Sequence, residues 1–352
     1  MKLFIVASIY QFFNMVRLTQ NDSKNTDVVL MKTEKNFVDC INIDKLKEYY
    51  GNVYICNFNP ISNNLIKLFY ILKNTYGNSV FGCKIIKKYD EIYLAGTESI
   101  SKTVATRVLS SNGSFYYYED GLETYCSVLD PKVKRKIDFV FKLMHGYYPI
   151  EKCKKVFVYE PKANDLNPLN ISCQKIDKID RNREEKLKKL LCELYICQPF
   201  IINKKVIFLN AWFNTAEEYN LQNKMLTMLV NTFGAENICV KTHPNELKDI
   251  DRLPGVEYIE SKCCFEVSNL FQDWTDKIFV SMESTAAITP SMIFGDRPQV
   301  VFFNKIFQKE FPKYEEVLGT IELFKNLYKG VSAPNDMQEF QTILEKLSIQ
   351  QE

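Results

Sequence analysis

Two adjacent carboxylates stand at the end of an aromatic run in the first half of the chain. The run Phe115–Tyr118 reads FYYY and is typical of a buried strand, and Glu119, Asp120 and Gly121 follow it directly. A carboxylate at the end of a buried strand is partly desolvated, which raises its pKa and suits it to general-base catalysis. Gly121 leaves room for a substrate or for a positive φ angle. The alternative interpretation is an Asp-Gly turn that leads into a helix.

One of only two histidines follows a second apolar run. The segment VKTHPNE carries Lys241, His243 and Pro244 at the end of the run NICV. Histidine titrates near neutral pH, so at a strand end it can donate a proton to a phosphate leaving group. Lys241 adds positive charge beside it, and Pro244 fixes the turn while removing a backbone donor. A surface histidine in a strand-to-helix loop is the alternative interpretation.

A pair of hydroxyl residues follows a third apolar run. Ser284 and Thr285 come after the run Ile278–Met282 and open a segment rich in small residues. Hydroxyls and free N–H groups at a helix start form an anion site that suits a nucleotide phosphate, and simple N-capping is compatible with that role. Pro290 lies one to two turns into this segment, so we expect the helix to kink or restart there.

Further acids lie near other strand ends. Glu266 comes shortly after the run Val256–Glu260, where a carboxylate can accept both hydroxyls of a ribose; an exposed helix glutamate is the alternative. Glu217 and Glu218 follow the run VIFLN and could supply or replace the base, although acids at that position are favoured at a helix start by the dipole.

The elements that must position these residues alternate between short apolar strands and amphipathic helices. Strands buried on both faces and separated by helices indicate parallel sheets. We therefore expect an α/β protein with two Rossmann-like domains, residues 1–170 and 171–352, facing a central cleft, and a C-terminal helix at Asn335–Leu347. The expected strands are KLFIVAS, TDVVLM, NVYICNF, EIYLAG, FYYY, VFVYE, VIFLN, NICVKT, VEYIE, KIFVSM and QVVFF.

The amino-acid composition disfavours several classes of function. The 352 residues carry a net charge of +2, which gives no general case for nucleic-acid binding. Eleven cysteines without a CxxC pair, and only two histidines, make a zinc site unfavourable and point to a reducing compartment. The first residues are interpreted as a buried strand rather than a signal peptide. The basic cluster Lys132–Lys136 is interpreted as a solvated helix start or a patch for anionic lipid.

The order of these motifs resembles that of bacterial sialyltransferases. A Glu-Asp-Gly motif in the first half precedes His-Pro, a glutamate in FEV and a Ser-Thr pair in the second half. The pattern is most similar to glycosyltransferase family 52, which includes lipooligosaccharide α-2,3-sialyltransferases. The segments FIVASIYQFFN and KKYDEIYLAG also resemble strands of that family, and the resemblance covers roughly residues 1–310.

The resemblance implies a GT-B fold and an inverting transfer of sialic acid from CMP-sialic acid to a terminal galactose hydroxyl of a lipooligosaccharide or capsule. No metal or other cofactor is implied. Asp120 is then the base with Glu119 beside it, and His243 is the acid. The CMP-binding residues implied are Lys241, Pro244, Glu266, Ser284 and Thr285, and the loop near Gln11, together with Gly121, is expected to meet sialic acid or the acceptor.

Other activities remain open from the sequence. They are a related GT-B enzyme with another donor or product, such as a polysialyltransferase or a glucosyltransferase, and a non-catalytic nucleotide-sugar binder. The family resemblance implies a cytoplasmic protein with peripheral contact at the inner face of the cytoplasmic membrane, and a homodimer is compatible with it.

Overall fold

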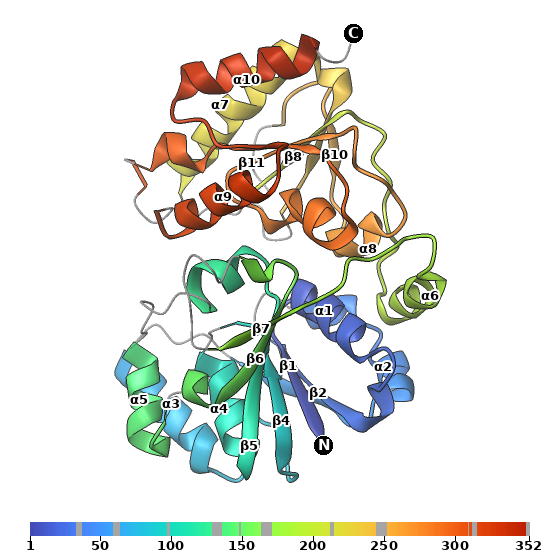
Figure 1. Cartoon of the computed structure of the whole chain (residues 1–352). Helices are drawn as coiled ribbons and strands as arrows, with labels where there is room; N and C mark the ends of the chain where they lie inside the picture. Colours follow the sequence, from blue (N-terminus) through green and yellow to red (C-terminus); the bar gives the residue numbers. More distant parts are fainter. Residues whose placement is uncertain are drawn as a thin grey trace. The chain divides into compact units, whose positions relative to one another are not determined.

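The computed structural model divides the chain into two compact units (Figure 1). The first unit contains residues 1–177 and 182–198, and the second contains residues 178–181 and 199–352. The structure describes residues 1–32, 37–58, 64–96, 99–128, 136–147, 149–162, 171–211, 215–243, 252–308, 310–311 and 315–349.

The first unit is built on a parallel sheet whose strand order is β3-β2-β1-β4-β5-β6-β7. Successive strands pair outward from β1 on one side and from β4 on the other, so the connections reverse direction between β1 and β4. Such a reversal places the loops after these strands around a crevice at their carboxyl ends. The strands are β1 (Lys2–Val6), β2 (Thr26–Lys32), β3 (Val53–Asn57), β4 (Tyr89–Leu94), β5 (Leu109–Tyr118), β6 (Cys153–Val158) and β7 (Ser172–Lys175).

Helices cover both faces of this sheet (Figure 1). In the figure α1 and α2 lie on one face and α3, α4 and α5 on the other, as right-handed crossovers require when the strand order reverses. Ser8 caps α1 by accepting a hydrogen bond from the Gln11 N–H, and most of that helix is buried. The helices are α1 (Ile9–Thr19), α2 (Ile43–Tyr49), α3 (Asn64–Tyr76), α4 (Ser99–Val108), α5 (Lys136–His145) and α6 (Glu185–Leu194).

The second unit repeats this plan with a parallel sheet ordered β10-β9-β8-β11-β12-β13, reversing between β8 and β11. All residues of β8, β9 and β11 are buried, which explains why these strands are continuous apolar runs. The strands are β8 (Val206–Leu209), β9 (Ile238–Lys241), β10 (Glu257–Ile259), β11 (Ile278–Ser281), β12 (Gln299–Phe302) and β13 (Val331–Ser332), and the α-helices are α7 (Ala216–Phe233), α8 (Phe265–Asn269), α9 (Glu315–Leu327) and α10 (Met337–Ile349).

Each of the eleven expected strands is present, and the two parallel-sheet domains are confirmed. The sequence missed β7 and β13, the last strand of each sheet. The β7 strand reads SCQK and is largely exposed, and β13 has two residues, so neither shows an apolar run.

The division between the units lies later than the expected position near residue 170. The β7 strand completes the first sheet by pairing with β6, and α6 packs on α1 and α2, so residues up to 198 remain largely with the first unit. Within this stretch, 178–181 belongs to the second unit, where Arg181 forms two hydrogen bonds of 2.7 and 2.6 Å with the carboxylate of buried Asp296.

Candidate functional site

The Glu-Asp-Gly motif lies at the carboxyl edge of the first sheet, directly after β5. Gly121 has φ of 67°, which confirms the expected positive φ and turns the chain sharply after the two acids. The Asp120 N–H donates to Thr124 Oγ1 at 2.6 Å, which closes the turn from the other side. The motif therefore forms the turn that the alternative interpretation expects, and the base role stays a prediction.

Glu119 is fully buried, and the burial raises the pKa of its carboxyl group to about 8. Its Oε2 accepts hydrogen bonds from the Tyr125 hydroxyl at 2.7 Å and from the Tyr159 N–H at 3.2 Å, which offset part of that cost. Its Oε1 is buried with no hydrogen-bond partner among the described residues. Glu119 is therefore mainly a neutral acid at pH 7, and it is shielded from a substrate.

Asp120 is half-buried and keeps part of its surface in solvent. Its Oδ2 accepts a hydrogen bond of 2.8 Å from Gln11 Nε2, across 109 positions of sequence. The structure thus brings together two of the residues singled out in the sequence. Because Asp120 can contact a substrate and Glu119 cannot, Asp120 is the stronger candidate for a base.

Helix α1 presents a row of polar side chains to this edge. After Gln11, Asn14 Nδ2 donates to the Glu119 carbonyl at 3.1 Å, and Asn14 Oδ1 accepts from the Tyr159 hydroxyl at 2.7 Å. One turn further, Arg17 donates to the Tyr159 hydroxyl and to the Asp177 carbonyl. The sequence analysis missed Asn14 and Arg17. The signal was a repeated spacing of three residues, from Gln11 to Asn14 and from Asn14 to Arg17, on an otherwise apolar helix. This spacing places the three side chains on one face.

The Ser-Thr pair lies at the carboxyl edge of the second sheet, after β11 and beside the point where the strand order reverses. Ser284 Oγ accepts from the Ala286 N–H at 3.3 Å, and the Ser284 N–H donates to Ser281 Oγ at 3.0 Å. Several N–H groups of this turn are thus satisfied internally, and the phosphate-binding role of the pair stays a prediction. The segment continues as a 3₁₀ turn, Thr285–Ala287, and restarts as a π-helix at Pro290, as expected.

His243 follows β9, on the same edge of the second sheet, and is half-buried. The preceding residue, Thr242, is anchored to Ile259 of β10 through its N–H (3.1 Å) and its hydroxyl (3.0 Å). Lys241 is buried, and its ammonium group donates to the Thr242 and Ser261 carbonyls at 2.9 Å each. Lys241 thus stabilises the end of β9, two residues before His243. Pro244 lies outside the described residues.

Glu266 lies in the first turn of α8 and is buried, in contrast to an exposed helix glutamate. Burial raises the pKa of its carboxyl group, and the Cys264 thiol donates to its Oε2 at 2.8 Å. Glu266 thus resembles Glu119 in being a buried carboxyl group that accepts hydrogen bonds from neighbouring donors.

Glu217 and Glu218, the alternative candidates for the base, lie in the first turn of helix α7, where the helix dipole favours acidic residues. Thr215 and Glu218 form a reciprocal capping box, and Glu218 is buried in it. Glu217 is exposed in the first turn. Deeper in the helix, buried Gln222 accepts a hydrogen bond of 2.8 Å from the Ala211 N–H after β8. Both glutamates thus lie in the first turn of α7, and their alternative role as the base stays a prediction.

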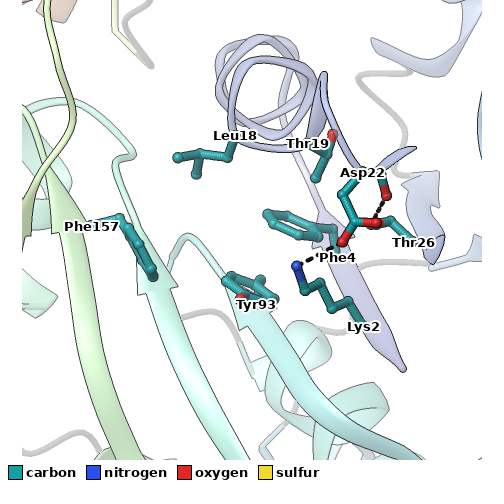
Figure 2. Close-up of a pocket in the computed structure, with 8 residues that line it drawn as sticks. All are labelled: Lys2, Phe4, Leu18, Thr19, Asp22, Thr26, Tyr93 and Phe157. Carbon is teal, nitrogen blue, oxygen red and sulfur yellow. Dashed lines mark hydrogen bonds and ion pairs between the residues drawn. The ribbon is translucent and has the colours of Figure 1, made fainter. Parts of the chain in front are cut away.

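A cavity of about 220 Å³ lies against one face of the first sheet, beside the end of α1 and the loop that follows it (Figure 2). Figure 2 shows the ion pair of Lys2 with Asp22, which measures 2.8 Å, at its polar side. The remaining lining residues are Phe4, Leu18, Thr19, Thr26, Tyr93 and Phe157.

The described residues contain no group of three or more His, Cys, Asp or Glu side chains arranged to hold a metal ion. In the same part of the chain, no helix combines the length and the apolar character needed to cross a bilayer.

Comparison with solved structures identifies the architecture. Spinosyn forosaminyltransferase SpnP aligns with a TM-score of 0.51 and 10% identity, covering 99% of this chain and 94% of that one. The glycotransferase of kitacinnamycin gives 0.49 and 8%, with 99% and 90% coverage, and Anabaena Alr3699/HepE in complex with UDP and glucose gives 0.47 and 12%, with 98% and 89%. No protein-family model and no curated protein matches the chain. The first likeness, together with the two parallel sheets, shows a GT-B-like fold.

Proposed function

We propose that the protein is an inverting glycosyltransferase that moves sialic acid from CMP-sialic acid to a terminal galactose hydroxyl of a bacterial surface glycan, a lipooligosaccharide or a capsule, with an α-2,3 linkage. Three observations support this proposal: the GT-B-like fold, the order of the four motifs, and the placement of those motifs at strand edges. The observation that carries it is Asp120, held by Gln11 at the carboxyl edge of the first sheet while the adjacent Glu119 is buried.

Asp120 acts on the acceptor. Its carboxylate takes the proton of the galactose hydroxyl as that oxygen forms a bond to the anomeric carbon of sialic acid, and the bond from that carbon to the CMP phosphate oxygen breaks. Attack opposite the leaving group inverts the anomeric centre. Glu119 supports this step indirectly, because a neutral buried neighbour adds no second negative charge beside Asp120 at pH 7.

Residues of the second sheet act on the leaving CMP. The Ser284 hydroxyl and Thr285 bind the phosphate, and His243 stabilises or protonates it as it departs. Lys241 holds the strand end before His243 and adds positive charge nearby. Glu266 is assigned to the ribose hydroxyls. In this scheme protein donors neutralise the departing phosphate, so neither a metal nor a cofactor is proposed.

We also propose that the protein is cytoplasmic and contacts the membrane peripherally through α3 and α5. Leu65, Ile66 and Phe69 on α3 are 57–71% exposed, and Phe139 and Leu143 on α5 are 57% and 71% exposed. The Tyr76 hydroxyl at the end of α3 donates to the Met144 carbonyl of α5, and the two helices lie side by side (Figure 1). Apolar side chains that project from adjacent helices are typical of binding surfaces.

Charge favours a lipid partner for this surface. Helix α3 contains two lysines, Lys67 and Lys73, and no acidic residue. Exposed Lys142 on α5 lies 4.0 Å from Glu151. Lysines beside projecting apolar groups complement anionic headgroups above the acyl region of a leaflet.

A donor screen that reads the released nucleotide tests the activity. We expect CMP to be released from CMP-sialic acid when a lactose-type acceptor is present, with a single sialic acid added. Release of UDP from a UDP-sugar would assign a different donor, and long polymers would assign a polysialyltransferase. Binding of CMP-sialic acid without any turnover would indicate a non-catalytic binder.

A further inference from the structure

We infer that Gln11 is a positioning residue: its side-chain amide is locked in one orientation so that it presents an N–H donor to Asp120 and fixes the carboxylate for proton removal. The contact between Gln11 and Asp120 stands on the structure alone, whereas its role in proton removal rests on the function proposed above.

The orientation of the Gln11 amide is dictated by its surroundings. Gln11 is 2% exposed, and its Oε1 accepts a hydrogen bond of 2.6 Å from the Ala7 N–H. A backbone N–H can only donate, so the amide oxygen must face Ala7 and the amide nitrogen must face Asp120. The Gln11 backbone is fixed as well, because its N–H donates to the Ser8 hydroxyl at 3.1 Å.

Asp120 is consequently held at two points, its carboxylate by Gln11 and its backbone N–H by Thr124. Gln11 Nε2 donates to Oδ2 at 2.8 Å, and the Asp120 N–H is bound by Thr124 Oγ1 at 2.6 Å. A base in a displacement reaction must reach the acceptor proton in a narrow range of geometry, and supporting contacts commonly set that geometry. A donor on one oxygen also favours the ionised carboxylate, which is the form that can accept a proton.

The second unit provides a natural control. Gln222 is also buried and also accepts from the N–H of an alanine, Ala211, that follows the first strand of its sheet. Among the described residues, the Gln222 side chain forms no hydrogen bond with a carboxylate. Losing its amide removes the same kind of structural bond as losing that of Gln11, without affecting Asp120.

The experiment uses the full-length protein and the variants Gln11→Met, Gln11→Glu and Gln222→Met. Methionine keeps the apolar volume and removes the donor. Glutamate places a second carboxyl group against Asp120, where two carboxylates must share a proton. If Gln11 positions Asp120, Gln11→Met lowers kcat about 10- to 100-fold with KM for the donor nearly unchanged, and the acidic limb of kcat/KM moves to higher pH. Gln11→Glu moves that limb further.

A double-mutant cycle separates positioning from general loss of structure. In an Asp120→Asn background, Gln11→Met should cost no further activity, because its effect acts through the carboxylate. Gln222→Met should lower thermal stability to a similar degree while leaving the pH profile in place. An equal loss in both backgrounds, or a loss with an unmoved acidic limb, would overturn the inference.

A second readout does not depend on the reaction. The carboxyl ¹³C signal of Asp120, assigned by its loss in Asp120→Asn, is titrated in the wild-type protein and in Gln11→Met. We expect a higher midpoint in the variant. An unchanged midpoint contradicts the contact itself. A raised midpoint in a protein that turns over no donor leaves the contact standing and refutes the proposed function, and with it the catalytic role of Gln11.

Discussion

At the carboxyl edge of the first sheet, two acids are held by side chains of α1 and of the turn after β5, and by the Tyr159 N–H just after β6. The corresponding edge of the second sheet carries hydroxyls, an imidazole and a buried glutamate. Each edge has a buried glutamine, Gln11 or Gln222, that accepts a hydrogen bond from an alanine N–H after the first strand of its sheet. Within the described residues, the glutamine of the first unit also donates a hydrogen bond to a carboxylate, and that of the second unit does not. Under the proposed function, this difference assigns the base to the first unit and the anion site to the second.

The largest expected effect tests the acidic edge. Asp120→Asn keeps an acceptor oxygen but removes the base, so turnover should fall about 10²–10⁴-fold with the fold intact. Asp22→Asn is the matched control, since Asp22 lies at the opposite edge of the same sheet and pairs with Lys2 there. Its turnover should change by about twofold or less, as expected for an exposed ion pair. Equal losses in the two variants would remove the distinction between the edges.

The second prediction concerns the edge that binds the anion. His243→Ala should lower turnover about 10²-fold or more, with a smaller effect on CMP affinity, because the imidazole acts on the phosphate as it leaves. Added imidazole should restore part of the turnover. Weakened CMP binding with unchanged turnover would make His243 a binding residue and shift the acid role elsewhere.

The third prediction uses the buried carboxyl group of Glu119. Its pKa is about 8 in the folded protein against an ordinary value of 4.5, so its contribution to stability is complete below pH 4.5 and is lost as the pH rises to about 8. Glu119→Gln should abolish this decline in the free energy of unfolding, which amounts to roughly 5 kcal/mol at most. The pH dependence of stability is compared between the wild-type protein and Glu119→Gln by hydrogen exchange of peptides from β5 and β6, corrected for intrinsic exchange rates. A decline of equal size in the variant would show that another group causes it.

The smallest effect is expected at the proposed membrane surface. Phe69→Glu should lower binding to vesicles that contain phosphatidylglycerol about tenfold or more, because it places a charge in the apolar contact. Ile349→Glu is the control, since Ile349 is equally exposed at 71% but lies on α10. Vesicle binding that is the same in both variants contradicts the proposal. A dimer that dissociates only in Phe69→Glu would assign the surface to a second copy of the chain.

The sequence was sufficient for the strands and for the acids that follow them, because strands buried on both faces appear as apolar runs and strand ends carry polar residues. It could not reveal the bond between Gln11 and Asp120, since that pairing depends on β1, β4 and β5 lying side by side in the sheet. It also missed β7, whose pairing with β6 is fixed by the sheet rather than by its own polar residues. Long-range register, not local propensity, builds the base and its support.

The most direct test of the central claim follows one reaction by NMR, with wild-type protein, CMP-sialic acid and lactose in a single tube. The account predicts that CMP appears together with sialyl-lactose, and that the anomeric configuration of the product is opposite to that of the donor. A product with retained configuration would contradict the single displacement with Asp120 as base, and an absence of both products would contradict the proposed activity.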